Sequence, residues 1–238
     1  MKTLLLPLFI LMNYCNAWAQ DSTLVTIKTG SRIKDVLATT DIFFYPKFIS
    51  GNVLFRDGTK ATARMNYNSL FDQILFIDNK GDTLALKNEK TIKFISLDKD
   101  TFYYNEGYVR LIESNSVVKL AERKVWEVAD IRKIGSHDRP ANTFAVTSFK
   151  TLTDGFGGTH DLVLNEDLVL RKKPKYYFGD TYNHFVPAGK KNLFLFFPKE
   201  YNGLANYLKK NKVNFNNKND LEKVAQFLEQ IIEHLEQD

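Results

Sequence analysis

The chain has 238 residues, and its 33 Lys and Arg against 28 Asp and Glu give a formal net charge of +5. That charge is nearly balanced for this length, so it gives no electrostatic reason to expect a nucleic-acid partner. The only cysteine is Cys15, which excludes disulfides, a thiolate nucleophile and cysteine-bound metal from the rest of the chain. Stability must come from an ordinary hydrophobic core, for which 19 Phe and 11 Tyr supply sheet-forming side chains.

Residues 1–19 have the pattern of a secretory signal peptide. Lys2 gives a positive start, Leu4–Met12 is an apolar run too short to cross a bilayer as a helix, and Ala17-Trp18-Ala19 supplies the small residues that cleavage needs. We expect cleavage before Gln20 and an exported protein, periplasmic or extracellular.

The alternatives for this segment are a buried apolar strand and a lipid anchor on Cys15. Lipid attachment requires a small residue directly before the cysteine, and Tyr14 occupies that position, which disfavours the anchor. No second long apolar segment follows, so we expect no transmembrane segment in the mature chain.

Residues 51–68 predict a β-hairpin, because apolar and polar side chains alternate on both sides of Asp57-Gly58. A three-residue loop, 56–58, aligns Val53 with Ala61, whereas a two-residue turn would mix the two faces. We therefore expect a type I turn followed by Gly58 in the left-handed region. This register gives one face to Val53, Phe55, Ala61, Ala63 and Met65.

Two further segments, 74–86 and 101–112, repeat this pattern with loops that end at Gly81 and Gly107. The shared loop geometry predicts an antiparallel meander, although the sequence repeat is not strict. The expected aligned pairs are Phe76 with Leu84, Ile74 with Leu86, Tyr104 with Tyr108, and Tyr103 with Val109.

The remaining part of the β region is less regular. Residues 91–97 alternate cleanly and predict a strand, and residues 117–123 predict a strand or, alternatively, a helical turn. Near 135–165 we expect an irregular excursion from the sheet, with a strand at Thr143–Phe149. Two short extended segments should follow, one on each side of Pro174.

The period changes to helical near residue 190. Residues 190–198 predict a short helix or buried run ended by Pro198, and residues 199–211 carry one apolar stripe. The last segment is the clearest helix, and Asn219 with Glu222 three residues later fits a reciprocally capped start. Its apolar stripe is Leu221, Val224, Ala225, Leu228, Ile231, Ile232 and Leu235.

These elements predict an α+β fold, in which a mainly antiparallel β meander forms a curved sheet or partly open barrel. Two or three C-terminal helices should pack on it. We divide the chain into the signal peptide (1–19), the β domain (20–189) and a helical C-terminal segment (190–238).

Three stretches carry a resemblance: FYPKFISGNVLFRDGTKATARMNYN, LFIDNKGDTLAL, and the region from YYFGDTYNHF onward. Over roughly residues 44–232 the chain resembles uncharacterised secreted proteins of Bacteroidota bacteria. An "LNYN"-like motif stands at Met65–Asn68, and an "NKVNF…DLEKL"-like tail stands at Asn211–Phe215 and Asp220–Val224. The resemblance implies a bacterial origin and export. That group has no established activity, so it implies no catalytic residue.

Two runs of residues are candidate binding sites. The first could be a platform for carbohydrate or peptide, or cross-strand core packing: Phe102, Tyr103, Tyr104 and Tyr108. The second could contact an anionic polymer or a membrane surface, or be a solvated turn: Arg171, Lys172, Lys173 and Lys175.

Signatures of catalysis and metal binding are weak. The four histidines have no zinc-binding spacing, and Ser148, His160 and Asp161 lack the G-x-S-x-G turn of a hydrolytic triad. The Gly-rich loop 154–161 matches neither a P-loop nor a calcium loop. Asp78 and Asp82, opposed across the second hairpin turn, are weak metal candidates. We expect no metal and no cofactor.

The favoured interpretation is a non-catalytic exported protein of the cell envelope that binds or scaffolds a protein, lipid or glycan. One alternative is a carrier of a lipid or other apolar molecule in a cavity of the curved sheet. A second alternative is an enzyme with dispersed catalytic residues, which would need a histidine and a carboxylate converging in a cleft.

Overall fold

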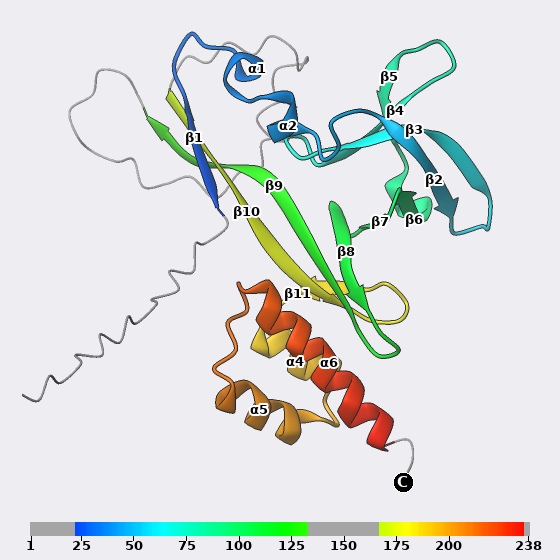
Figure 1. The fold of residues 1–238 in the computed structure, drawn as a ribbon, viewed down its shortest axis with the longest axis vertical. Helices are drawn as coiled ribbons and strands as arrows, with labels where there is room; N and C mark the ends of the chain where they lie inside the picture. Colours follow the sequence, from blue (N-terminus) through cyan, green and yellow to red (C-terminus); the bar gives the residue numbers. More distant parts are fainter. Residues whose placement is uncertain (1–21, 133–166, 236–238) are drawn as a thin grey trace, which may run out of the picture.

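Antiparallel pairing of strands builds one large sheet in the computed structural model, which describes residues 22–132 and 167–235. The strand order is β1-β10-β9-β8-β7-β6-β2-β3-β4-β5, with β11 also on β10, and the two end strands are not paired to each other. The predicted α+β fold with an antiparallel, unclosed sheet is confirmed (Figure 1). The elements are β1 (Thr23–Ile27), α1 (Ile33–Val36), α2 (Thr39–Ile42), β2 (Ile49–Phe55), β3 (Lys60–Asn68), β4 (Gln73–Ile77), β5 (Thr83–Ala85), η1 (Glu89–Thr91), β6 (Ile92–Leu97), β7 (Asp100–Tyr104), β8 (Tyr108–Ser114), β9 (Lys119–Arg132), β10 (Asp167–Gly179), β11 (Phe185–Pro187), α4 (Lys190–Phe196), α5 (Tyr201–Lys210) and α6 (Lys218–Leu235).

The three hairpin registers are confirmed. At the first turn the amide of Gly58 donates to the carbonyl of Phe55 at 3.1 Å, and Gly58 has a φ of 89°. Gly81 repeats this geometry with a φ of 91°, because both loops need one residue in the left-handed region. The aligned pairs are Val53 with Ala61, Phe76 with Leu84, Tyr103 with Val109, and Tyr104 with Tyr108.

The prediction of two short segments around Pro174 was wrong, because β10 is one strand of 13 residues. Along one edge β10 pairs with β9 throughout, and along the other it pairs with β1 up to Lys172 and with β11 from Tyr177. Pro174 therefore lies where one edge of β10 has no partner among the described strands, and its missing N–H is tolerated there. The excursion near 135–165, including Thr143–Phe149, lies outside the described residues.

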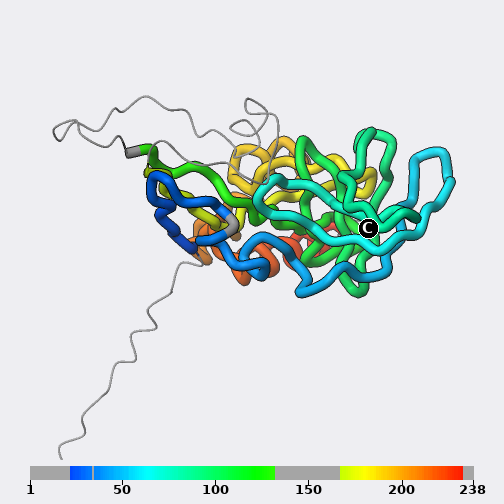
Figure 2. Tube along the Cα trace, turned by 90° about the horizontal axis from the view of Figure 1, so that it is seen from above, coloured from blue at the N-terminus to red at the C-terminus, as the bar shows by residue number. Residues whose placement is uncertain are grey.

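The sequence patterns predicted no strand or helix of the mature fold before residue 49, but β1, α1 and α2 lie there. Among the described strands β1 pairs only with β10, and its buried Ile27 packs against Trp126 of β9 and other residues of that core cluster. Figure 2 shows this N-terminal segment (dark blue) at the opposite end of the molecule from the first hairpin (cyan).

The three C-terminal helices pack on the sheet as predicted, but only at one end of it. Leu193 of α4, Leu204 of α5 and Leu228 of α6 are buried against Phe178 of β10 and Leu120 of β9. Figure 1 places these helices beneath β9, β10 and β11, away from the β2–β5 hairpins. None of the helices in the described parts of the chain is long and apolar enough to cross a membrane.

The predicted cap of the last helix was wrong by two residues. α6 begins at Lys218, and the side-chain oxygen of Asn217 accepts a hydrogen bond from the amide of Asp220 at 3.1 Å. The Asp220 carboxylate in turn accepts from the amide of Asn214 at 2.9 Å. Several asparagines in NFNNKND can cap a helix, so the local pattern alone does not choose among them.

Strand β9 contributes buried side chains to every part of the core that the structure describes. In the described parts of the chain the buried apolar side chains form four clusters, and β9 contributes to each of them, through Leu120, Val125, Trp126 and Ala121. Its 14 residues confirm the strand predicted at 117–123 and remove the helical alternative.

Candidate functional site

The segment Met65–Asn68 at the end of β3 organises one region of the sheet. Met65 and Tyr67 point into the core, while the alternate asparagines bind backbone. The side chain of Asn66 donates to the carbonyl of Tyr45 at 2.8 Å and accepts from its amide at 3.1 Å. Asn68 accepts from the amides of Leu70 and Phe71 at 2.9 and 3.2 Å, which turns the chain into β4. Residues 43–45 are thereby fixed beside β3.

Strand register brings five side chains to a common face. Arg110 of β8 lies opposite both Phe102 of β7 and Glu122 of β9. Residues directly opposite in an antiparallel pair share a face, and side chains repeat every second residue. Lys124 is therefore on this face too, and so is Lys172, which lies opposite Trp126 of β9.

These residues surround a small pocket of about 60 Å³. That volume holds about four to six water molecules, since each needs roughly 10–15 Å³ by this measure. Aromatic rings form much of the wall, and charged groups form the rest. The lining residues are Phe44, Tyr67, Ser69, Phe102, Tyr108, Arg110, Glu122, Lys124 and Lys172.

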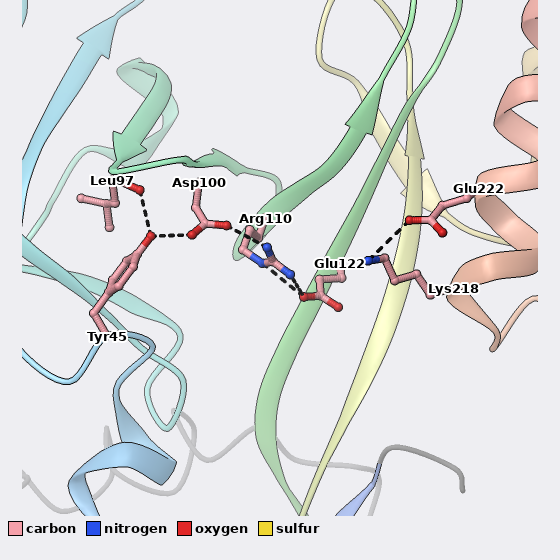
Figure 3. Close-up of polar contacts among 7 residues, drawn as sticks. All are labelled: Tyr45, Leu97, Asp100, Arg110, Glu122, Lys218 and Glu222. Carbon is pink, nitrogen blue, oxygen red and sulfur yellow. Dashed lines mark hydrogen bonds and ion pairs between the residues drawn. The ribbon is translucent and has the colours of Figure 1, made fainter. Parts of the chain in front are cut away.

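A chain of polar contacts crosses three strands beside the pocket (Figure 3). The hydroxyl of Tyr45 lies 2.5 Å from Asp100 Oδ2, and Arg110 Nη1 donates to Asp100 Oδ1 at 2.8 Å. Arg110 also donates to Glu122 Oε1 through Nε and Nη2. Burial and the neighbouring Asp100 raise the pKa of Tyr45. This chain fixes the guanidinium between two carboxylates, 5.2 Å from the centre of the Phe44 ring.

The turn between β3 and β4 supplies a second acid, the partly buried Asp72. Its carboxylate accepts hydrogen bonds from the hydroxyl of Tyr67 at 2.8 Å and the amide of Tyr108 at 3.1 Å, and it pairs with Arg123. Tyr108 itself is 2% exposed, and its hydroxyl makes no hydrogen bond within the described chain. Burial raises the pKa of Tyr108, so this hydroxyl keeps its proton.

We predict opposite effects for removing the hydroxyls of these two neighbouring tyrosines. Tyr108→Phe should raise the free energy of unfolding by about 1 kcal/mol, because it removes a buried hydroxyl without a partner. Tyr67→Phe should lower it by about 1 kcal/mol, because Asp72 loses a donor. Urea denaturation followed by circular dichroism measures both. Equal losses in the two variants would contradict the assignment of Tyr108 as unpartnered.

The charged form of Lys172 is destabilised by its surroundings in the pocket. Lys172 Nζ donates to the backbone carbonyl of Asp41 at 2.7 Å and lies 5.5 Å from the centre of the Trp126 ring. Burial and the charge of Lys124 lower the pKa of Lys172 from 10.5 to about 8, and Asp41 opposes this only in part. Between these two values the unfolded chain binds more protons, so the stability of the fold rises with pH in this window.

The predicted aromatic platform is divided between two faces of the sheet. Phe102 and Tyr108 line the pocket, and Tyr104 packs against Tyr108 with ring centres 5.4 Å apart. Tyr103 points to the other face and packs against Phe185 at 5.2 Å. Alternation along the strand explains the division.

The predicted basic run is divided in the same way. Only Lys172 reaches the pocket, whereas Arg171, Lys173 and Lys175 lie on the opposite face of β10. Lys175 pairs there with Glu127.

Of the two acids of the second hairpin, Asp78 binds backbone amides through its carboxylate. Asp78 accepts from the amides of Lys80 and Asp82 at 2.8 and 2.9 Å, as in an Asx-turn. Within residues 22–132 and 167–235 no group of three His, Asp or Glu could hold a metal ion. His184 pairs with Asp180 at 3.0 Å on the surface. Ser148, His160 and Asp161 lie outside the described residues.

Sequence reasoning missed the polar residues that line the pocket, Arg110, Glu122 and Lys124, and those that lie beside it, Tyr45, Asp72 and Asp100. A signal was present, because Arg110 and Glu122 interrupt strands at positions that otherwise face the core. Charged residues there require partners, which the sequence does not name.

Comparison with known proteins does not extend these findings. No protein-family model matches the chain, and no curated protein or solved structure matches it significantly. The relation to secreted proteins of Bacteroidota therefore stays a prediction from the sequence.

Proposed function

We propose that this is a non-catalytic, exported protein of the cell envelope that binds a larger partner by enclosing one small group of it in the pocket. The pocket carries the proposal, because five strands and two loops converge to place aromatic rings and cations around a space of about 60 Å³. Binding sites commonly combine apolar walls with a few fixed polar groups.

The pocket supports binding better than catalysis. Arg110 is held between Asp100 and Glu122, and Asp72 is held by Tyr67, Tyr108 and Arg123. Acids and bases that take part in a reaction need freedom to exchange protons with a substrate. No histidine is among the lining residues of the pocket. These fixed ion pairs suit a rigid recognition surface.

A carrier of lipids finds less support. Pockets that enclose a whole small ligand measure roughly 300–1,000 Å³, and the pocket of about 60 Å³ is much smaller. It accommodates one end of a molecule, with the remainder outside.

The proposal is tested by capture from the native cell envelope. The protein is isolated from the envelope fraction, and its N-terminal peptide should begin at Gln20. The chain from Gln20 is then immobilised in three forms: wild type, Lys172→Met and, as a control on the opposite face, Lys173→Met. A partner retained by wild type and Lys173→Met but reduced at least fivefold by Lys172→Met supports the proposal. Identical capture by all three overturns it.

A further inference from the structure

The positive charge of the chain is concentrated in helices α4 and α5 and the short turn that follows them. Residues 190–212 contain six lysines and one acid, Glu200, and their net charge of +5 equals the formal net charge of the whole chain. The acids and bases of the remaining sequence therefore balance. All six lysines of this segment are exposed: Lys190, Lys191, Lys199, Lys209, Lys210 and Lys212. The helical end of the molecule is thus the part that attracts an anionic surface.

Helix α4 also exposes apolar side chains beside these lysines. Leu195 is 69% exposed, and Tyr201 at the start of α5 is 50% exposed. The Tyr201 ring packs against the Phe194 ring with centres 4.4 Å apart, and Lys190 Nζ lies 5.6 Å from the centre of the Phe194 ring. Lys191 precedes Leu195 by four residues, so these two side chains are neighbours on the helix surface. We call these five residues the α4 surface.

The fold itself uses the other side of α4. Leu193 and Phe197 are buried in the core cluster that joins α4 to α5, α6 and the sheet. Leu195 is outside every core cluster of the described chain, so its exposure contributes nothing to packing. An exposed leucine bordered by lysines and aromatic rings is typical of a helix that lies in a membrane interface.

We propose that the α4 surface binds the surface of an anionic lipid bilayer. Lys190 and Lys191 would contact the headgroups, Leu195 would enter the boundary of the acyl chains, and the Tyr201 ring would lie at headgroup level. This inference goes beyond the proposed function, because none of the residues that line the pocket belongs to α4 or α5.

The composition of the α4 surface also predicts how the contact behaves. Two exposed apolar side chains bury too little area to hold a protein on a neutral bilayer, and lysines alone provide no insertion. Both kinds of side chain are therefore required. The contact should be reversible, and salt should weaken it, because exposed charges are screened over about 10 Å at moderate ionic strength.

Co-sedimentation with vesicles tests the lysines, using the chain from Gln20. Vesicles of equal parts phosphatidylglycerol and phosphatidylcholine should bind at least about tenfold more strongly than vesicles of phosphatidylcholine alone. Lys190→Glu with Lys191→Glu should weaken binding to the anionic vesicles by at least about tenfold. The control is Lys60→Glu with Lys80→Glu, which makes the same change of charge at exposed positions in the β2–β5 hairpins, at the other end of the sheet (Figure 1). This control should bind within about twofold of wild type.

A fluorescent label tests the insertion of Leu195. Cys15 is the only cysteine of the chain, so a nitrobenzoxadiazole label on Leu195→Cys in the chain from Gln20 reports on that position alone. Its emission should shift to the blue and rise on anionic vesicles, because the label leaves water. The control label on Leu84→Cys, at a position 45% exposed on β5, should not respond. Circular dichroism checks that each variant keeps the native fold.

The outcomes distinguish a lipid surface from other occupants. Binding that depends on Lys190 and Lys191, together with a response of the label at position 195, supports the proposal. Equal binding to neutral and anionic vesicles overturns it, as does binding that survives the charge reversal. Equal binding to dextran sulfate without a response of the label would assign the lysines to a soluble polyanion. A dimer that Leu195→Ser dissociates, with no binding to vesicles, would assign the surface to a second copy of the chain.

These experiments are independent of the pocket, because the variants leave every lining residue unchanged. Binding to anionic vesicles through the α4 surface stands even if capture from the envelope does not depend on Lys172. Conversely, capture that depends on Lys172 stands even if the vesicle experiments overturn the lipid contact.

Discussion

Gly107→Ala should lower the free energy of unfolding by about 3–5 kcal/mol. Gly107 has a φ of 142°, which strains any residue with a Cβ. An added Cβ would also clash with the side chains of Asp72 and Arg123, which form a partly buried ion pair. The variant therefore combines backbone strain with the breaking of that pair. Urea denaturation followed by circular dichroism measures the loss.

The first hairpin provides a matched control. Gly58 also ends a three-residue hairpin loop and has a positive φ, 89°, but an added Cβ there has no heavy atom within 4 Å. Gly58→Ala should lower the free energy of unfolding by only about 1 kcal/mol, from backbone strain alone. Similar losses in the two variants would show that the Asp72–Arg123 pair does not depend on the glycine.

Arg110→Met should also lower the free energy of unfolding by about 3–5 kcal/mol. Its removal leaves two acids without their cation: the side chains of Asp100 and Glu122 are only 6% and 15% exposed. The methionine keeps much of the volume, so the loss reports on charge more than on packing.

Two variants test that explanation. Adding Asp100→Asn and Glu122→Gln to Arg110→Met should recover at least half of the loss, because the uncompensated charges are gone. Arg56→Met removes an exposed arginine whose Nε donates to the carbonyl of Lys90, and it should cost less than about 0.5 kcal/mol. A triple variant no more stable than Arg110→Met would point to lost packing as the cause.

The sequence predicted those parts of the fold that depend on neighbouring residues. Alternation on both sides of a glycine-closed loop determines a hairpin register, because a slip of one residue would expose Val53 and its whole face. The last helix was equally clear from its apolar stripe. Its start was misplaced from Asn217 to Asn219, because caps depend on which asparagine side chain reaches an amide.

Parts that depend on distant residues could not be predicted. β10 continues through Pro174 because, on one edge, its pairing with β1 ends before this residue and its pairing with β11 begins after it. β1 lies near the N-terminal end of the described chain, far from β10 in sequence. The pocket depends on the same kind of assembly. It unites Phe44, the turn at Ser69 and five strands, so the linear runs of aromatic and basic residues were misleading guides to a shared site.

The pairing of β1 also has a consequence for biosynthesis. Among the described strands β1 forms backbone pairs only with β10, and the ion pair between Lys28 and Asp167 joins residues 139 positions apart. Strands β2 to β9 can pair with one another soon after each is synthesised, since their partners are closer in sequence than β10 is to β1. β1 can pair with β10 only after β10 has been synthesised. Although β1 precedes the other described strands in the sequence, we therefore expect it to be among the last to reach its native position.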